Sequence, residues 1–285
     1  MKKLTVILFT LIISIGLLFF ASCRSAPPPT PDVQVKTVEK ITLDPSDAVW
    51  DDAPMHLSKL ILQDLVEPRL MEASTQEVRV KAISAGGEMA FRLEWPDDSQ
   101  NDLPGPKRFM DACAVQLPLV NETNVPAPQM GEAGKTVEIS YWRADWQAVM
   151  DGRADDINAI YPNASVDHYP FEAKSLEADP NAQRDAALRY APARTLGNRR
   201  AGPRESPVED LIAEGPGTLT PNTRSISNGK GMRGGKGWAV VISRALPEGF
   251  SAERPSQVAF AVWEGNHGET GARKMRTGWV QLTMK

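Results

Sequence analysis

Cysteine is scarce in this 285-residue sequence, which contains only two. After Cys23 only Cys113 remains, and a single cysteine makes no internal disulfide. The sequence has no C-x-x-C-H segment, which excludes a covalently attached c-type haem, and too few cysteines for an iron–sulfur cluster held by cysteines alone. Cys113 lies in an apolar, strand-like segment and is expected to pack as a small buried hydrophobe.

The motifs of several common catalysts are also missing. None of the three histidines, His56, His168 and His267, stands in an H-x-x-x-H or H-E-x-x-H spacing, so zinc-dependent hydrolysis has no support. There is no G-x-S-x-G segment and no Gly-rich phosphate loop. The net charge is −4 and Lys and Arg form no long basic stripe, which argues against nucleic-acid binding because phosphate contacts need clustered cations. The sequence indicates no catalytic centre of its own.

The N-terminus has the layout of an export signal. Two lysines precede an uninterrupted apolar run over residues 4–20, and "ASC" follows at once. This layout predicts a signal peptide over residues 1–22, and "FASC" resembles the bacterial lipobox, whose cysteine is lipidated. Cys23 would then begin a Pro-rich, lipidated tether over residues 23–34, anchored on the periplasmic side of a membrane. The alternative is that the apolar run stays uncleaved as a single membrane anchor.

Strand-like segments recur along the rest of the chain. Most alternate apolar and polar residues or are short and β-branched, and turn-forming residues bound them. They cover residues 33–39, 78–84, 88–95, 112–119, 136–144, 237–246, 258–263 and 277–282. The pattern predicts one all-β domain over residues 35–285, an antiparallel, immunoglobulin-like β-sandwich with long loops and a few short helices.

Three regions depart from this strand pattern. Residues 54–66 carry apolar residues at helical and strand spacing alike, and residues 176–191 are rich in helix formers. The region 171–233 is otherwise rich in Ala, Arg, Gly and Pro, and we expect it to be a long loop excursion from the sandwich. Loops of this length in compact domains usually serve a function or bind partners.

Five segments in a fixed order resemble a known family. They are RFMDACAVQLPL, PQMGEAGKTVEISYWRADWQ, VEDLIAEGPGTLTP, GKGWAVVISRAL and VAFAVWEGNHGETGARKMRTGW. The series resembles the ethylbenzene dehydrogenase gamma-subunit family, the haem b subunits of periplasmic type II molybdenum enzymes related to dimethyl sulfoxide reductase. The resemblance extends over residues 35–285.

The resemblance implies a β-sandwich that holds one haem b between loops, with a Met and a Lys as axial ligands of the iron. Met130 in "PQMG" matches the methionine, and Lys274, between the last two strands, matches the lysine. Lys230, Lys236 and His267 compete for the second position, since imidazole also suits iron. Without the resemblance, the sequence would favour another interpretation, in which Met130 is a hydrophobic residue at the edge of the core and Lys274 is a solvated charge in a turn.

The function implied by the resemblance is transfer of single electrons, not catalysis, because two protein ligands leave the iron no open position for a substrate. The implied partners are the iron–sulfur and molybdopterin subunits of a type II molybdenum enzyme, and a cytochrome c or membrane carrier. A lipid anchor departs from the usual soluble gamma subunit. The alternative is a haem-free exported sandwich that binds carbohydrate or another ligand through exposed tryptophans, although most tryptophans here lie in strand-like segments, where core packing is expected.

Overall fold

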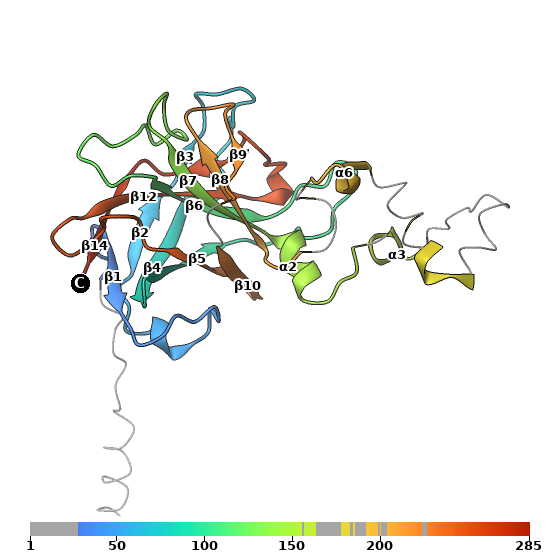
Figure 1. Cartoon of the computed structure of the whole chain (residues 1–285), viewed down its shortest axis with the longest axis horizontal. Coiled ribbons are helices and arrows are strands. Elements are labelled where there is room, and N and C mark those ends of the chain that lie inside the picture. The colour runs from blue at the N-terminus through green and yellow to red at the C-terminus, as the bar shows by residue number, and fades with distance from the viewer. Residues whose placement is uncertain are drawn as a thin grey trace, which may run out of the picture.

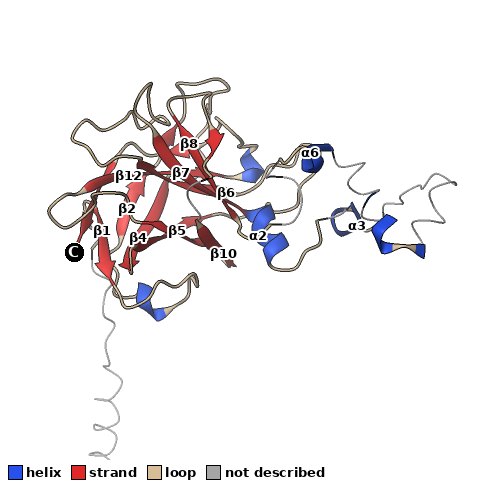
Figure 2. Ribbon diagram, in the orientation of Figure 1, coloured by secondary structure: helices blue, strands red, loops and turns tan. Residues whose placement is uncertain are grey.

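The chain is mainly β, with few helices (Figures 1 and 2). The computed structural model describes residues 28–155, 157–163, 178–182, 185, 192–198, 200, 204–223 and 227–285. The expected signal peptide, Cys23 and His168 lie outside these residues, as does most of the helix expected over 176–191. Within the part of the chain that is described, no helix has the length and apolar character needed to span a membrane.

Fourteen strands in the described residues join into one sheet. They are β1 (Val33–Thr37), β2 (His56–Lys59), β3 (Ile61–Leu62), β4 (Glu77–Ala85), β5 (Glu88–Pro96), β6 (Ala112–Pro118), β7 (Val137–Arg143), β8 (Val208–Ala213), β9 (Thr220–Pro221), β10 (Asn228–Gly234), β11 (Gly237–Ala245), β12 (Ser256–Trp263), β13 (Met275–Arg276) and β14 (Val280–Met284). The helices include α2 (Ala144–Met150), α3 (Ile157–Ile160) and α6 (Pro192–Thr195), with short 3-10 turns η1 (Ala48–Trp50) and η2 (Gly265–His267).

The sheet folds into two layers that share strand β12. Its strand order is β10–β11–β5–β4–β1–β14–β12–β6–β7–β8–β9, with β2 beside β4 and β13 between β12 and β3. Residues 256–258 of β12 pair with β14 in the first layer, whereas residues 259–263 pair with β6 in the second. One strand therefore carries the chain from one layer to the other.

The main hydrophobic core lies between the two layers. Phe91 on β5 contacts Phe260 on β12 edge to face, with ring centroids 6.1 Å apart. Trp142 on β7 contacts Trp95 on β5 and Trp238 on β11 in the same manner. Such pairs add to the stabilisation that comes from burying large aromatic side chains. These contacts join the layers, and they confirm that these tryptophans are core residues.

The strand pattern in the sequence predicted most of the sheet. Each of the eight expected segments overlaps a strand, and Cys113 is fully buried, as expected for a small hydrophobe. The sheet is mixed, however, because β1 pairs in parallel with both β4 and β14, while the other pairings among the described strands are antiparallel. Residues 38–76 connect β1 to β4 and are long enough for the crossover that parallel neighbours need. The strands also outnumber the seven to nine of an immunoglobulin domain.

Two regions outside the eight predicted strand segments also contain strands. Residues 54–66 contain β2 and β3, because residues 56–60 alternate between buried and accessible positions and β2 pairs with β4. The predicted loop excursion over 171–233 contains β8, β9 and β10, whose pairing with β7 and β11 overrides a composition poor in strand formers. The tether predicted to end at residue 34 is also too long, since β1 begins at Val33, which lies opposite Leu282.

Gly231 explains why the sequence pattern did not predict strand β10. A Cβ at this position would clash with the ring of Trp142, so only glycine lets β10 lie against the core. We predict that Gly231→Ala lowers the unfolding free energy by about 1–3 kcal/mol through overpacking. Gly235→Ala is the matched control, because a Cβ there meets nothing within 4 Å. Urea denaturation of both variants measures the difference, and equal losses would contradict the packing argument.

Candidate functional site

A cavity of about 490 Å³ lies on the outer face of the second layer. Successive side chains of a strand point to opposite faces of a sheet. On β12, Phe260 and Val262 belong to the main core, whereas Ala261 and Trp263 pack in a second apolar cluster that lines the cavity. The second layer is therefore apolar on both faces, and the outer face is the one that can receive a ligand.

The floor of the cavity is built from residues that lie side by side on β12, β6, β7 and β8. Ala261 lies opposite Ala114, and Ala114 lies opposite Tyr141. In the next row, Ile139 lies between Gln116 and Leu211. Because two alanines meet at the centre, the floor is low there, and larger side chains rise around it.

Met130 reaches the cavity from the loop between β6 and β7. Its φ is 68°, a left-handed conformation that is uncommon for a residue with a side chain and costs roughly 1–3 kcal/mol. The loop is tied down on several sides: Gly215 donates its N–H to the Met130 carbonyl at 2.8 Å, and Gln116 donates to the Pro128 carbonyl at 3.0 Å. The strained residue is thus held by the surrounding structure, as is common at ligand sites.

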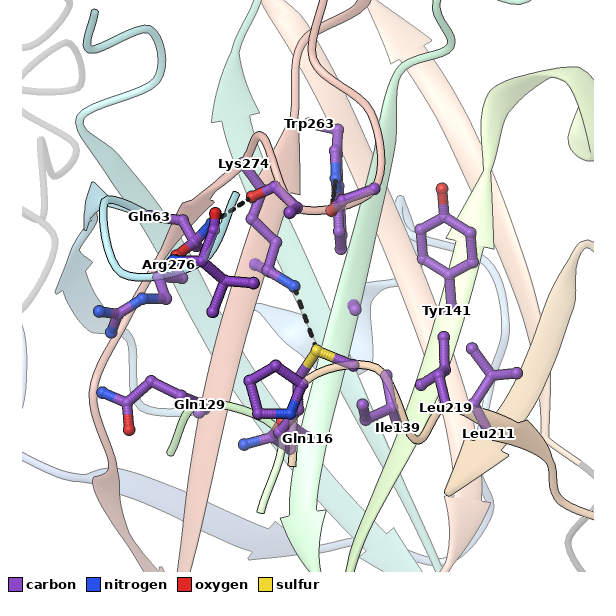
Figure 3. A pocket seen from close by; sticks show the side chains of 18 of the residues that line it. Gln63, Gln116, Gln129, Ile139, Tyr141, Leu211, Leu219, Trp263, Lys274 and Arg276 are labelled. Atoms are coloured by element: carbon purple, nitrogen blue, oxygen red, sulfur yellow. Dashed lines mark hydrogen bonds between the residues drawn. The ribbon is translucent and has the colours of Figure 1, made fainter. Parts of the chain in front are cut away.

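Lys274 reaches the same point from the opposite side. Its Nζ lies 3.9 Å from Met130 Sδ and 5.1 Å from the centroid of the Trp263 ring. Figure 3 marks the contact between Lys274 and the sulfur atom with a dashed line. Lys274 and Arg276 are two residues apart in an extended segment and both line the cavity, while Met275 between them is buried in the main core. The structure therefore brings the two predicted ligands together.

Burial changes the acid–base behaviour of Lys274. Desolvation, with a smaller contribution from the positive charge of Arg276, lowers the pKa of Lys274 to about 8. Desolvation disfavours the charged form of an amine, so the neutral form with its free lone pair becomes accessible near neutral pH. A neutral amine next to a thioether sulfur forms a pair of donors that suits a transition metal ion.

Gln63 fixes the position of Lys274, and no sequence pattern marked it. This buried side chain donates to the Ala272 carbonyl at 3.0 Å and to the Val66 carbonyl at 2.8 Å, and it accepts from the N–H groups of Leu65 and Val66. The backbone N–H of Gln63 donates to the carbonyl of Lys274 at 3.2 Å. An isolated glutamine belongs to no motif, so only the structure could identify these hydrogen bonds between Gln63 and the segment that carries Lys274.

The other candidates for the second ligand lie elsewhere. Lys230 on β10 and Lys236 in the turn after it belong to the first layer. His267 on η2 is half exposed and lies 3.7 Å from Glu264. None of the three lines the cavity. The geometry therefore favours Lys274 over these residues as the partner of Met130.

Lys274 is expected to make the stability of the ligand-free protein depend on pH. Folding lowers its pKa from an ordinary 10.5 to about 8, so the unfolded chain binds more protons between these values. The unfolding free energy should then rise with pH from about 8 to about 10.5, and Lys274→Met should reduce this rise. Denaturant unfolding across this range compares the two proteins, with Lys236→Met as an exposed control. Identical pH dependence in wild type and Lys274→Met would contradict the prediction.

Comparison with solved structures finds a weak likeness to carbohydrate-binding modules. A family 9 module from Caldicellulosiruptor kristjanssonii in complex with cellotriose has a TM-score of 0.43 and 11% identity, over 89% of this chain and 93% of that one. A second structure of such a module from the same organism, in complex with glucose, has a TM-score of 0.38 and 10% identity, over 89% and 95% of the two chains.

Curated sequences give a more specific relationship. The protein described as the respiratory nitrate reductase haem subunit ORF7 of Haloferax mediterranei is 25% identical over 263 residues, covering 89% of this chain and 73% of the relative. The chlorate reductase gamma subunit of Ideonella dechloratans is 26% identical over 247 residues, covering 84% and 78%. The family model described as ethylbenzene dehydrogenase matches residues 47–275, a range that includes Met130 and Lys274, and the chain therefore belongs to the ethylbenzene dehydrogenase family.

Proposed function

We propose that this protein binds one haem b, with Met130 and Lys274 as axial ligands, and carries single electrons within a reductase complex. The observation that carries the proposal is the 3.9 Å approach of Met130 Sδ to Lys274 Nζ over a low apolar floor. Family membership supports it, as do relatives described as a haem subunit and a gamma subunit of reductases.

The donor set fits a haem better than a bare metal ion. Among the described residues no group of three or more His, Cys, Asp or Glu side chains could hold a metal, and a macrocycle would supply the further ligands that these side chains do not. Metal–sulfur and metal–nitrogen bonds of the length found for zinc, about 2.3 and 2.0 Å, add up to roughly 4.3 Å across a metal. The observed separation of 3.9 Å is close to that value.

The chain's own residues prepare the two ligands. Lys274 must lose its proton before it can bind iron, and its burial already favours the neutral amine. Met130 offers a soft, neutral thioether, which favours reduced iron and raises the reduction potential. The bound haem supplies one-electron chemistry at its iron. With Met130 and Lys274 both bound to the iron, no position would be left for a substrate.

The proposed partners follow from the same relationship. A gamma subunit works beside other subunits, and we propose the iron–sulfur and molybdopterin subunits of a type II molybdenum enzyme as neighbours. A cytochrome c or a membrane carrier completes the electron path on the other side. The gamma subunit of chlorate reductase supports this assignment by its likeness to the chain.

Carbohydrate binding through exposed tryptophans has less support. Six of the seven tryptophans are buried: Trp50, Trp95, Trp142, Trp146, Trp238 and Trp263. The indole N–H of the seventh, Trp279, donates to the Pro126 carbonyl at 2.6 Å. Stacking on a sugar needs an accessible ring, so these residues are better explained by packing.

Substitution of the two ligands tests the haem proposal. Met130→Ala should open one axial position, allow carbon monoxide to bind the ferrous protein, and lower the reduction potential by part of the roughly 0.8 V that axial ligands cover. Lys274→Ala should convert the low-spin ferric signal in electron paramagnetic resonance to high spin, or release the haem. Lys236→Ala and His267→Ala are controls and should keep the wild-type signal, because neither residue lines the cavity. If the low-spin signal survives in Lys274→Ala but is lost in one of the control variants, the residue changed in that control would be assigned as the second ligand.

We further propose that Cys23 carries lipid and holds the domain on the periplasmic side of a membrane. The basic start, the apolar run and "ASC" support this. Residues 24–32 lie between Cys23 and β1, and at full extension they span at most about 30 Å, which would keep the domain close to the membrane. Cys23→Ala should leave an unprocessed precursor, and mass spectrometry of the mature protein should find lipid on Cys23. A mature N-terminus further along the chain without lipid would contradict the proposal.

A further inference from the structure

Three arginines line the cavity, and two of them are already paired with carboxylates. Arg143 donates to Asp145 at 2.8 and 2.9 Å, and Arg200 lies 2.8 Å from a carboxylate oxygen of Glu209. Both charges are satisfied within the protein. The third arginine, Arg276, differs from them.

Arg276 is buried without an ion pair among the residues that the structure describes. Only 8% of it is exposed, and its Nε has no hydrogen-bond partner. A terminal nitrogen donates at 3.4 Å to the Thr277 carbonyl, and Asp64 acts on the charge from beyond ion-pair distance. A guanidinium stays protonated in proteins, and burying an unpaired charge is costly. A carboxylate brought by a ligand would offset that cost.

The position of Arg276 places this charge at one edge of the cavity. Arg276 lies opposite Ala261, whose short side chain leaves space above the floor of the cavity. In Figure 3, Arg276, Gln63 and Gln129 lie to one side of the contact between Met130 and Lys274, whereas Tyr141, Leu211 and Leu219 lie to the other. Arg143 and Arg200 act on Tyr141 and also line the cavity, but their charges are offset by Asp145 and Glu209. Among the described residues, the edge with Arg276 is therefore the one that presents an unpaired guanidinium to the cavity.

We propose that Arg276 binds a carboxylate of the group held in this cavity. The inference depends on the proposed haem function, because haem is a flat group with two propionate carboxylates along one edge and apolar substituents around the rest. Arg276 would pair with a propionate, and the apolar edge would face Tyr141 and Leu211. Met130 and Lys274 would hold the iron, but by themselves they would not set the rotational orientation of the ring. The charge of Arg276 would favour one orientation.

The test compares haem with its dimethyl ester, in which both propionates lose their charge. The full-length haem-free protein is titrated with each, and binding is followed by the Soret band. Wild type should bind haem about 10- to 100-fold more tightly than the ester, the range expected for hydrogen bonds to a charged group. Arg276→Met should weaken the binding of haem but not that of the ester, so the ratio of the two affinities should fall close to one. Arg276→Lys keeps the positive charge and should restore part of the ratio.

Arg200→Met is the matched comparison, because its guanidinium already pairs with Glu209. It should keep the wild-type ratio of affinities. Equal affinity of wild type for haem and ester would overturn the inference, and this result needs no variant to fold. The inference would also be overturned if the preference for haem over the ester disappeared in Arg200→Met but persisted in Arg276→Met. If wild type bound neither compound in a low-spin form, the haem proposal itself would fail, which separates the two conclusions.

Discussion

The architecture depends on β12, the strand that belongs to both layers and is apolar on both faces. Its first three residues pair with β14, and the following five pair with β6. Val258, Phe260 and Val262 face the main core, while the residues between them, Ala259 and Ala261, line the cavity. Because side chains alternate along a strand, large residues can stabilise the fold on one face while small ones make room for a ligand on the other. Stability and ligand binding are assigned to different residues of the same strand.

The donor pair is assembled from two loops that are far apart in the sequence. Met130 precedes β7 and Lys274 precedes β13, and each is fixed by hydrogen bonds to backbone groups. The unusual φ of Met130 and the buried amine of Lys274 both cost free energy in the ligand-free protein. Binding of a metal to both atoms would offset these costs. In the proposed function, this cost in stability would be present before haem binds.

The sequence predicted those parts of the structure that local patterns control. Alternating residues identified β4, β5 and β11, because each has one face in the main core, and a short apolar run identified β12. β10 was missed because its glycines, such as Gly231, are required by a close neighbour and not by any local preference. The parallel partners of β1 could not be predicted either, since pairing between distant segments leaves no periodic signal.

The candidate site was only partly visible in the sequence. Met130 and Lys274 were matched through a family resemblance. Lys274 lines the cavity, whereas Lys230, Lys236 and His267 do not. Gln63 and Arg276 were not identified. Their importance lies in what they contact, or in the partner they lack, and such features depend on tertiary structure alone.

The placement of β1 has a mechanical consequence. β1 lies between β4 and β14, parallel to both, so the first strand of the domain is held along both edges, beside the last strand (Figure 1). A force applied along β1 from its N-terminal end would strain the hydrogen bonds on both edges together, in shear, and would not open them one after another. The domain can therefore be pulled from its N-terminus without peeling the sheet, a property that would suit the proposed tether at that end.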